Sequence, residues 1–166
     1  MTISKFVTYE PSIAQTIIDD FKAKPGALLP LLHALQDRFS YIPNESIPLI
    51  ATALMLSRAE VHGVISFYHH FRTQQPGRHV VEICRAEACQ AVGARQLEHH
   101  AKQTLHLDYH QTTTDNTITL EPVYCLGNCS CGPSVRVGND IHANMDPHAF
   151  DALVERLKTD RLEVLQ

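Results

Sequence analysis

The 166-residue sequence contains no tryptophan, and aromatic side chains make up only 7% of it. It also lacks long uncharged stretches, and none approaches the ~20 apolar residues that a membrane-spanning helix needs. The N-terminal stretch has no apolar signal core and too few arginines for a transit peptide. We therefore expect a cytoplasmic protein without a membrane span.

An excess of positive charge is missing as well. Lys and Arg number 14 against 18 Asp and Glu, which gives a formal net charge of −4. Because nucleic acids are bound by basic surfaces, this balance argues against a general nucleic-acid binder. The sequence has no Gly-x-Gly-x-x-Gly or Walker motif, so we expect no nucleotide on this chain. It has no Cys-x-x-Cys pair either, which argues against a thioredoxin-type thiol enzyme.

The composition that remains is that of a globular protein, 44% hydrophobic and 19% charged. Its charge is uneven along the chain. Residues 1–78 carry 7 basic and 6 acidic side chains, whereas residues 79–166 carry 7 basic and 12 acidic ones, a net charge of −5. This asymmetry indicates two parts with different roles.

The first half has the residue spacing of amphipathic helices. Apolar residues recur at helical intervals in four stretches, over about 13–21, 28–39, 45–56 and 57–66. Pro25 and Gly26 end the first stretch, and Ser57 with Glu60 forms a capping box at the start of the fourth. The sequence predicts a small helical bundle that ends in a linker at 73–78.

The second half alternates between strand and helix patterns. Short apolar or alternating runs predict strands over 79–83, 107–112, 117–123, 134–137 and 141–145. Helices are predicted over 93–105 and from Pro147 onward, where Asp146 is suited to be the N-cap. The expected order, β-α-β-β-β-β-α, is that of an α/β sandwich.

Four of the five cysteines form two closely spaced pairs. Cys84 and Cys89 are separated by four residues (CRAEAC), and Cys125 and Cys129 by three (CLGNC). We expect Cys84 and Cys125 to end neighbouring strands, with each pair in the loop that follows its strand. Ligand sites collect at this edge of an open sheet, so the two pairs can converge. Four converging thiolates suit zinc or an iron–sulfur cluster.

The spacing of the pairs helps to choose between these metals. Zinc knuckles favour a gap of two residues, whereas gaps of four and three open each loop and favour two irons that each take two cysteines. A zinc-stabilised adaptor without a redox role stays as an alternative, and two disulfides are a weaker one in a cytoplasmic protein. The fifth cysteine, Cys131, is a bystander, a substitute ligand or a redox-active neighbour of the site.

Histidines and aromatic residues add two further questions. A Rieske cluster would need two histidines as ligands, but neither cysteine loop contains one. Phe67, Tyr68 and Phe71 form an aromatic group before the linker. They either pack in a core or form a docking edge for a partner.

The chain resembles a known protein family along nearly its whole length. The two cysteine pairs follow a helical first part, as in the thioredoxin-like [2Fe–2S] ferredoxin subunits of NADH dehydrogenases. That family includes the small iron–sulfur subunit of respiratory complex I and its counterparts in NAD-linked hydrogenases and formate dehydrogenases. The likeness is greatest to the gamma subunit type of soluble NAD-dependent formate dehydrogenases. It is carried by LLPLLHALQDRFSYIP (28–43), LSRAEVHGVISFYHHFR (56–72), VEICRAEACQAVGA (81–94) and EPVYCLGNCSCGPSV (121–135).

The resemblance implies an α+β or α/β fold in which residues 1–77 form a helical bundle and residues 78–166 a thioredoxin-like [2Fe–2S] domain. By position it makes Cys84, Cys89, Cys125 and Cys129 the ligands of one [2Fe–2S] cluster. The chain would then be a non-catalytic electron-transfer subunit of a cytoplasmic NAD-dependent formate dehydrogenase, or of complex I or an NAD-linked hydrogenase. The implied partners are a flavoprotein subunit that binds FMN and NAD and a large molybdenum or tungsten formate dehydrogenase subunit. No catalytic residue is expected on this chain.

Overall fold

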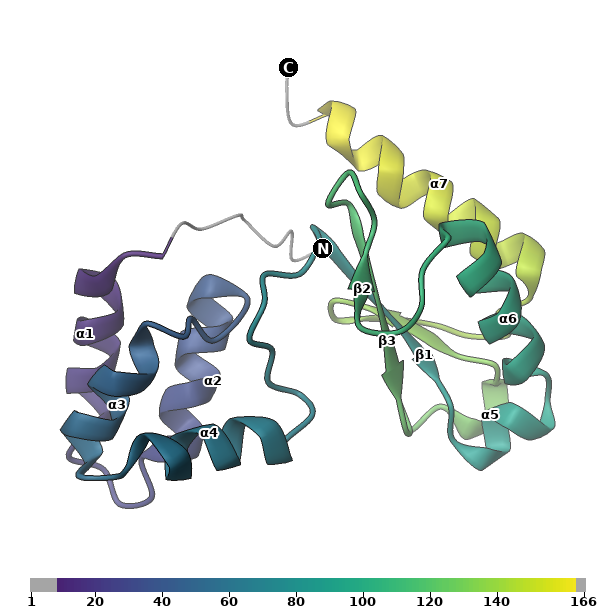
Figure 1. Ribbon diagram of the computed structural model, residues 1–166. Coiled ribbons are helices and arrows are strands. Elements are labelled where there is room, and N and C mark those ends of the chain that lie inside the picture. Colours follow the sequence, from purple (N-terminus) through teal and green to yellow (C-terminus); the bar gives the residue numbers. More distant parts are fainter. Residues whose placement is uncertain (1–8, 164–166) are drawn as a thin grey trace. The chain divides into compact units, whose positions relative to one another are not determined.

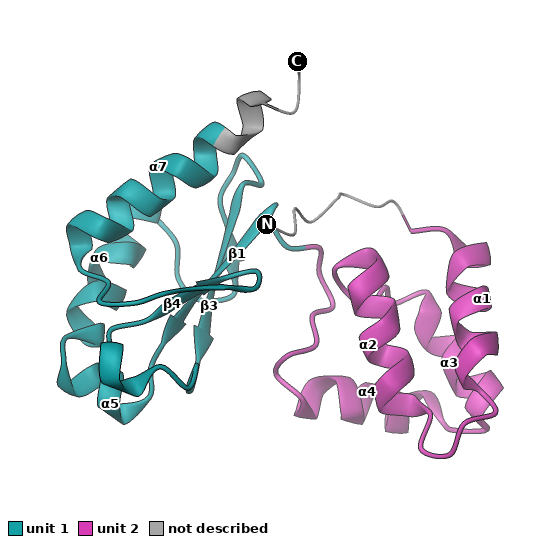
Figure 2. Cartoon of the chain, turned by 180° about the vertical axis from the view of Figure 1, so that it is seen from behind, with its two compact units in different colours: residues 1–4, 76–166 teal, residues 5–75 magenta. Residues whose placement is uncertain are grey.

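The computed structural model describes residues 9–163. The chain divides into two compact units, with the break between Gln75 and Pro76 (Figure 2). We propose that this break is the boundary between the helical domain predicted for 1–77 and the α/β domain predicted for 78–166.

The helical unit, which is unit 2 in Figure 2, contains four helices within residues 9–75 (Figure 1). They are α1 (Pro11–Phe21), α2 (Leu28–Phe39), α3 (Ser46–Leu54) and α4 (Arg58–Phe67). The predicted bounds of the second helix are those observed, whereas the third ends two residues early because Met55 adopts a left-handed conformation. The predicted capping box is present, since Ser57 and Glu60 hydrogen-bond each other's backbone N–H groups.

The core of this unit receives buried apolar side chains from all four helices. Those with no exposed surface include Ile18, Leu31, Leu35 and Ile50. Gln36 fastens the segment after α4 to this bundle, because its amide donates to the carbonyl of His70 (2.8 Å) and accepts from the backbone N–H of Arg72 (2.8 Å). Residues 70–72 are thereby fixed against α2.

The α/β unit, which is unit 1 in Figure 2, is a five-stranded mixed sheet with helices on one side. In chain order its elements are β1 (His79–Cys84), α5 (Glu87–Ala91), α6 (Ala94–Leu105), β2 (Gln111–Thr112), β3 (Ile118–Val123), a 3₁₀ turn (Cys129–Cys131), β4 (Val135–Val137), β5 (Asp140–His142) and α7 (Pro147–Glu163). The strand order is β2-β3-β1-β4-β5. Only the β1–β3 pair is parallel, and the other three pairs are antiparallel.

Helices α6 and α7 cover the same face of this sheet (Figure 1). Their buried side chains, among them Leu97 and Phe150, pack on alternate residues of the central strands, such as Val81 and Ile83. The successive residues of a strand point to opposite faces. The intervening residue Glu82 therefore lies on the other face, where it pairs with Arg136.

Three elements of this unit differ from the prediction. Helix α5 was not expected, because five residues are too few to show helical periodicity. Strand β2 contains only Gln111 and Thr112 of the predicted 107–112. The last strand ends at His142 instead of 145, since Asn144 has a positive φ of 49° that breaks the extended backbone.

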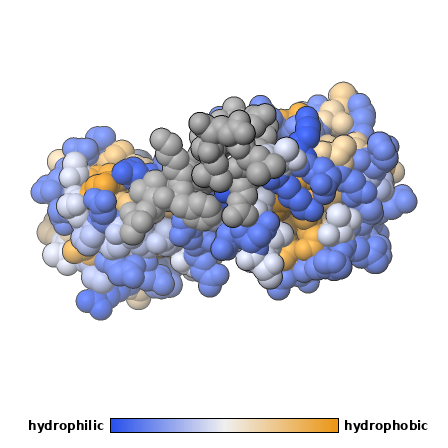
Figure 3. All heavy atoms as spheres, turned by 90° about the horizontal axis from the view of Figure 1, so that it is seen from above, coloured by the Kyte–Doolittle hydropathy of each residue, from blue (hydrophilic) through white to orange (hydrophobic). Residues whose placement is uncertain are grey.

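Among residues 9–163, no single helix is both long and apolar enough to cross a membrane. Only α3 and α4 taken together pass a test of length and composition, and they are bent by 113° at their junction. On the face drawn in Figure 3, hydrophobic side chains form small areas surrounded by hydrophilic ones.

Candidate metal centre

The first cysteine pair is buried at one end of the sheet. Cys84 is the last residue of β1 and Cys89 lies in α5, and each is 1% exposed. The expectation that Cys89 lies in a loop was therefore wrong, because residues 87–91 form a helical turn after the strand.

The second pair lies on the surface. Cys125 follows the end of β3 by two residues instead of ending the strand as expected, and Cys129 begins the 3₁₀ turn. Both are exposed. Cys131 ends the same turn and is partly exposed.

The pairing of the strands brings the two cysteine loops to one edge. Because β1 and β3 are parallel neighbours with Cys84 opposite Val123, both strands end at the same level. The backbone N–H of Arg85 donates to the carbonyl of Val123 (2.7 Å), and that of Cys84 to the carbonyl of Ser134 (3.0 Å). These bonds join the residues just before and just after the second cysteine pair to the end of β1.

The thiols contact one another mainly within pairs. The sulfur atoms of Cys125 and Cys129 are 3.9 Å apart, and Cys84 hydrogen-bonds Cys89. Electrostatic interactions also link Cys129 to Cys84 and to Cys89 across the two pairs. The structure thus brings the four predicted residues together as two pairs.

This arrangement disfavours the charged form of two of the thiols, those of Cys89 and Cys129, in the absence of a bound metal. Burial, followed by the hydrogen bond to Cys84, raises the pKa of Cys89, and a hydrogen bond from the Ser134 backbone opposes that shift. The hydrogen bond with Cys125 is the main cause that raises the pKa of Cys129. A bound cation reverses this balance, because metal ligation requires thiolates.

Two glycines shape the loops around the sulfur atoms. Gly127 has a φ of +74°, and its N–H donates to the sulfur of Cys125 (3.3 Å). Gly132 passes so close to the first pair that a Cβ there would lie 3.0 Å from Val92 Cγ2 and 3.2 Å from Cys89 Sγ. Sequence reasoning missed Gly132, although the Gly-Pro step after Cys131 marks a break in the chain at this point.

The donor set fits a cluster with two metal ions. Four thiols in two pairs match two irons that each take two cysteines, and N–H groups of Gly127 and Ser134 are directed at sulfur. Within the described part of the chain, no three His, Cys, Asp or Glu side chains are grouped so as to hold a single metal ion.

Of the aromatic group before the linker, one member lies in the core and two do not. Phe71 is 8% exposed, whereas Phe67 and Tyr68 are 73% and 43% exposed. Phe71 therefore packs in the core, whereas the side chains of Phe67 and Tyr68 are accessible to a partner.

The sequence of this chain is similar to those of known iron–sulfur proteins. The family model of the thioredoxin-like [2Fe-2S] ferredoxins matches residues 14–158. One subunit of the NADH-quinone oxidoreductase of Escherichia coli is 34% identical over 133 residues, 80% of each chain. The HndA subunit of the NADP-reducing hydrogenase of Solidesulfovibrio fructosivorans is 32% identical over 130 residues, 78% of this chain and 76% of the other.

A solved structure shares the fold. An NAD⁺-reducing [NiFe]-hydrogenase in its air-oxidised state matches 84% of this chain with a TM-score of 0.70 and 24% sequence identity. This chain spans only 24% of that hydrogenase chain. Because the family model matches residues 14–158, which are nearly all of the described residues, this chain belongs to the thioredoxin-like [2Fe–2S] ferredoxin family, whose cofactor is a [2Fe–2S] cluster.

Proposed function

We propose that the chain is the electron-transfer subunit of an NAD-linked oxidoreductase complex and that Cys84, Cys89, Cys125 and Cys129 hold its [2Fe–2S] cluster. The observation that carries this proposal is the meeting of the two thiol pairs at one edge of the sheet, in a chain that matches the ferredoxin family. The proposal assigns no catalytic residue to this chain.

The residues around the thiols would bind the [2Fe–2S] cluster and tune its reduction potential. When bound, the cluster supplies one-electron chemistry, which complements the two-electron hydride chemistry of flavin and nicotinamide. The N–H groups of Gly127 and Ser134 donate to cysteine sulfur and so favour the more negative state. The buried pair excludes water from one side of the site, whereas Cys125 and Cys129 form its exposed edge.

The proposed partner is a flavoprotein subunit that binds FMN and NAD. Supporting it, the relatives are subunits of an NADH-quinone oxidoreductase and of an NADP-reducing hydrogenase. Within this class we propose a cytoplasmic NAD-dependent formate dehydrogenase, which adds a large molybdenum or tungsten subunit. The support for the formate branch is the motif resemblance in 28–43, 56–72, 81–94 and 121–135.

An anaerobic optical spectrum of the purified chain tests the cofactor and its ligands. We expect visible charge-transfer absorption that bleaches with dithionite, together with equal amounts of iron and acid-labile sulfide. A colourless protein that stays colourless after reconstitution with iron and sulfide, and that contains zinc, would contradict the electron-transfer function and favour a zinc-stabilised adaptor.

Purification of the tagged chain from its own cells tests the complex. We expect a flavin-containing subunit and a molybdenum or tungsten subunit to copurify, with reduction of NAD by formate. A complex that instead reduces quinone with NADH, or NAD with hydrogen, would assign the chain to the complex I or the hydrogenase branch.

A further inference from the structure

A polar surface pocket lies directly beside the first cysteine pair. It has a volume of about 480 Å³ and is lined by Arg85, Gln90, Arg95, Glu98, His99 and Lys102, which we call the arginine pocket. Arg85 follows Cys84 in the chain, and Gln90 follows Cys89. The pocket therefore shares its wall with the segment that carries the buried thiols.

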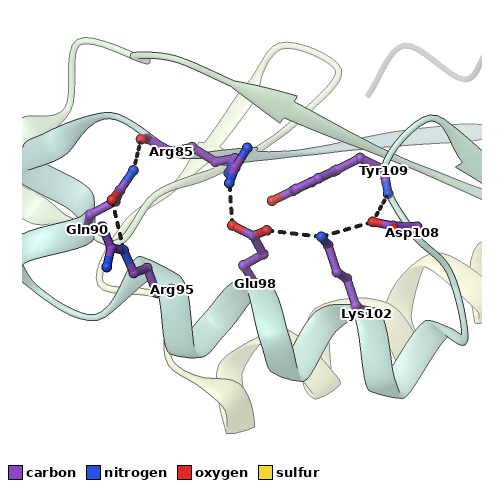
Figure 4. A network of polar contacts seen from close by, with 7 residues as sticks. All are labelled: Arg85, Gln90, Arg95, Glu98, Lys102, Asp108 and Tyr109. Carbon is purple, nitrogen blue, oxygen red and sulfur yellow. Dashed lines mark hydrogen bonds and ion pairs between the residues drawn. The ribbon is translucent and has the colours of Figure 1, made fainter.

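Most charges in and next to the arginine pocket are paired (Figure 4). The carboxylate of Glu98 accepts from Arg85 Nε (2.9 Å) and from Lys102 Nζ (3.0 Å), and Lys102 also reaches Asp108 (2.9 Å). These contacts hold α6 against the end of β1. The two cations, Arg85 and Lys102, balance the two carboxylates, Glu98 and Asp108, so this part of the network has no net charge.

Arg95 is the exception. Its Nε donates to the side-chain oxygen of Gln90 (2.9 Å), and no described carboxylate lies within ion-pair distance of it. The amide of Gln90 is itself fixed, because its nitrogen donates to the backbone carbonyl of Arg85 (2.6 Å). Arg95 is thus an exposed guanidinium held in place by a neutral side chain, with its two terminal nitrogens turned to no partner in the described chain.

Arg95 is a cation in a part of the chain that has a net negative charge. Residues 79–166 carry 12 acidic and 7 basic side chains, yet three of those seven basic residues line this one pocket. An arginine whose geometry is already fixed loses little conformational entropy when it binds a carboxylate in bidentate fashion. Charge and geometry are therefore complementary to an acidic group that comes from outside the chain.

We propose that the arginine pocket is a docking site for an acidic side chain of the flavoprotein subunit, with Arg95 as its anchor. This inference rests on the proposed function, and it adds the chemistry by which the partner would be recognised. A carboxylate bound here lies next to the segment of Cys84 and Cys89, so docking would place the partner beside the cluster site.

A carboxylate that is part of a partner protein fits the pocket better than a free anion does. Arg85 and Lys102 are already bound to Glu98, which leaves Arg95 as the one cation here without a carboxylate among the described residues. A single exposed charge binds a small anion weakly. At an interface it steers association instead, because the remaining contacts supply the affinity.

The rate of association with the copurified flavoprotein subunit tests the proposal. It would be measured at ionic strengths from about 0.02 to about 0.3 M, a range over which screening changes strongly. For Arg95→Glu we expect an association rate constant about tenfold lower at low salt, with a flatter salt dependence. Arg95→Gln should give a smaller fall in the same direction. Both variants should keep the visible spectrum of the wild type.

Arg156→Glu provides the matched control, because Arg156 is an exposed arginine on α7 of the same unit. It should associate at the wild-type rate. Equal rates and salt slopes for Arg95→Glu and the wild type would overturn the proposal. Saturable binding of inorganic phosphate to the isolated chain that depends on Arg95 would also overturn it, by showing a small-anion site. If the wild-type chain keeps its cluster but no flavoprotein copurifies with it, the result would contradict the proposed complex. It would then also contradict the assignment of a flavoprotein carboxylate to the arginine pocket.

Discussion

Only Ser130 separates Cys129 from Cys131, yet the two thiols have different neighbours. Cys129 interacts with Cys125 and Cys84, whereas the sulfur of Cys131 lies 3.6 Å from the hydroxyl of Ser130 and contacts none of the other cysteine sulfurs of the described chain. We predict that Cys131→Ser keeps the visible spectrum after reconstitution and that Cys129→Ser loses or shifts it. Absorption and electron paramagnetic resonance spectra of the two variants, compared side by side, would check this. Loss of the signal in Cys131→Ser would make that residue a ligand.

Gly132 is where a single methyl group should disturb the cysteine site. A Cβ at this position would lie 3.0 Å from Val92 Cγ2 and 3.2 Å from the sulfur of Cys89, a side chain that is buried. We predict that Gly132→Ala lowers the free energy of unfolding by about 1–3 kcal/mol. The absorption spectrum of its cluster should also shift. Denaturant titration and optical spectra measure the two effects.

Gly63 is the matched control for that substitution. It lies in helix α4, and a Cβ there would meet nothing within 4 Å. Gly63→Ala should therefore raise the free energy of unfolding by about 0.5–1 kcal/mol, because alanine favours the helix more than glycine does. A destabilising effect of the same size in both variants would show that Gly132 is not specifically constrained by its neighbours.

Among the elements, the turn between β2 and β3 depends on one carboxylate. Asp115 accepts hydrogen bonds from the Thr113 hydroxyl (2.5 Å), from the Thr117 backbone (3.0 Å) and from the Thr117 hydroxyl (2.7 Å). These bonds lower the pKa of Asp115 to about 2 from its usual 3.8. Since the folded pKa is the lower one, the charged form stabilises the fold above pH 3.8, and this contribution is lost as the pH falls through about 2.

We predict that Asp115→Asn is less stable than the wild type at neutral pH by about 1 kcal/mol, a figure reduced for the exposure of the turn to solvent. The difference should shrink steadily as the pH is lowered below about 4. Denaturant unfolding of both metal-free proteins across this range checks the sign. A difference that grows in acid would assign the turn's stability to another group.

The elements also show which parts of the fold can be predicted from sequence. Helix α2 and the capping box of α4 were predicted because apolar spacing and the Ser57–Glu60 pair are local signals. The four cysteines were predicted as a group because parallel strand ends share an edge. Helix α5 and strand β2 were not correctly predicted, since a stretch of five or of two residues shows no periodicity. The role of Gly132 depends on contact with Val92 and Cys89, about 40 positions away in the chain, which no local pattern reveals.

At the scale of the whole molecule, the two units have separate cores. The buried apolar cluster of the helical unit is drawn from residues 14–71, and that of the α/β unit from residues 81–157. A third, small cluster surrounds the first cysteine pair and includes Cys84, Cys89 and Ala94. The residues proposed to hold the cluster thus belong to the α/β unit alone.

This separation predicts that damage to the helical core leaves the cysteine site intact. Leu35 is fully buried in the helical unit, and Leu35→Ala in a packed core costs about 2–5 kcal/mol. In the full-length chain we expect faster amide hydrogen exchange in residues 9–75, while exchange in β1 and β3 and the visible spectrum stay as in the wild type. Leu120→Ala, which removes an equally buried leucine from β3, should do the reverse and reduce cluster retention. If Leu35→Ala also released the cluster, the two units would unfold together, and the domain boundary proposed at Gln75 would not separate two cooperative units.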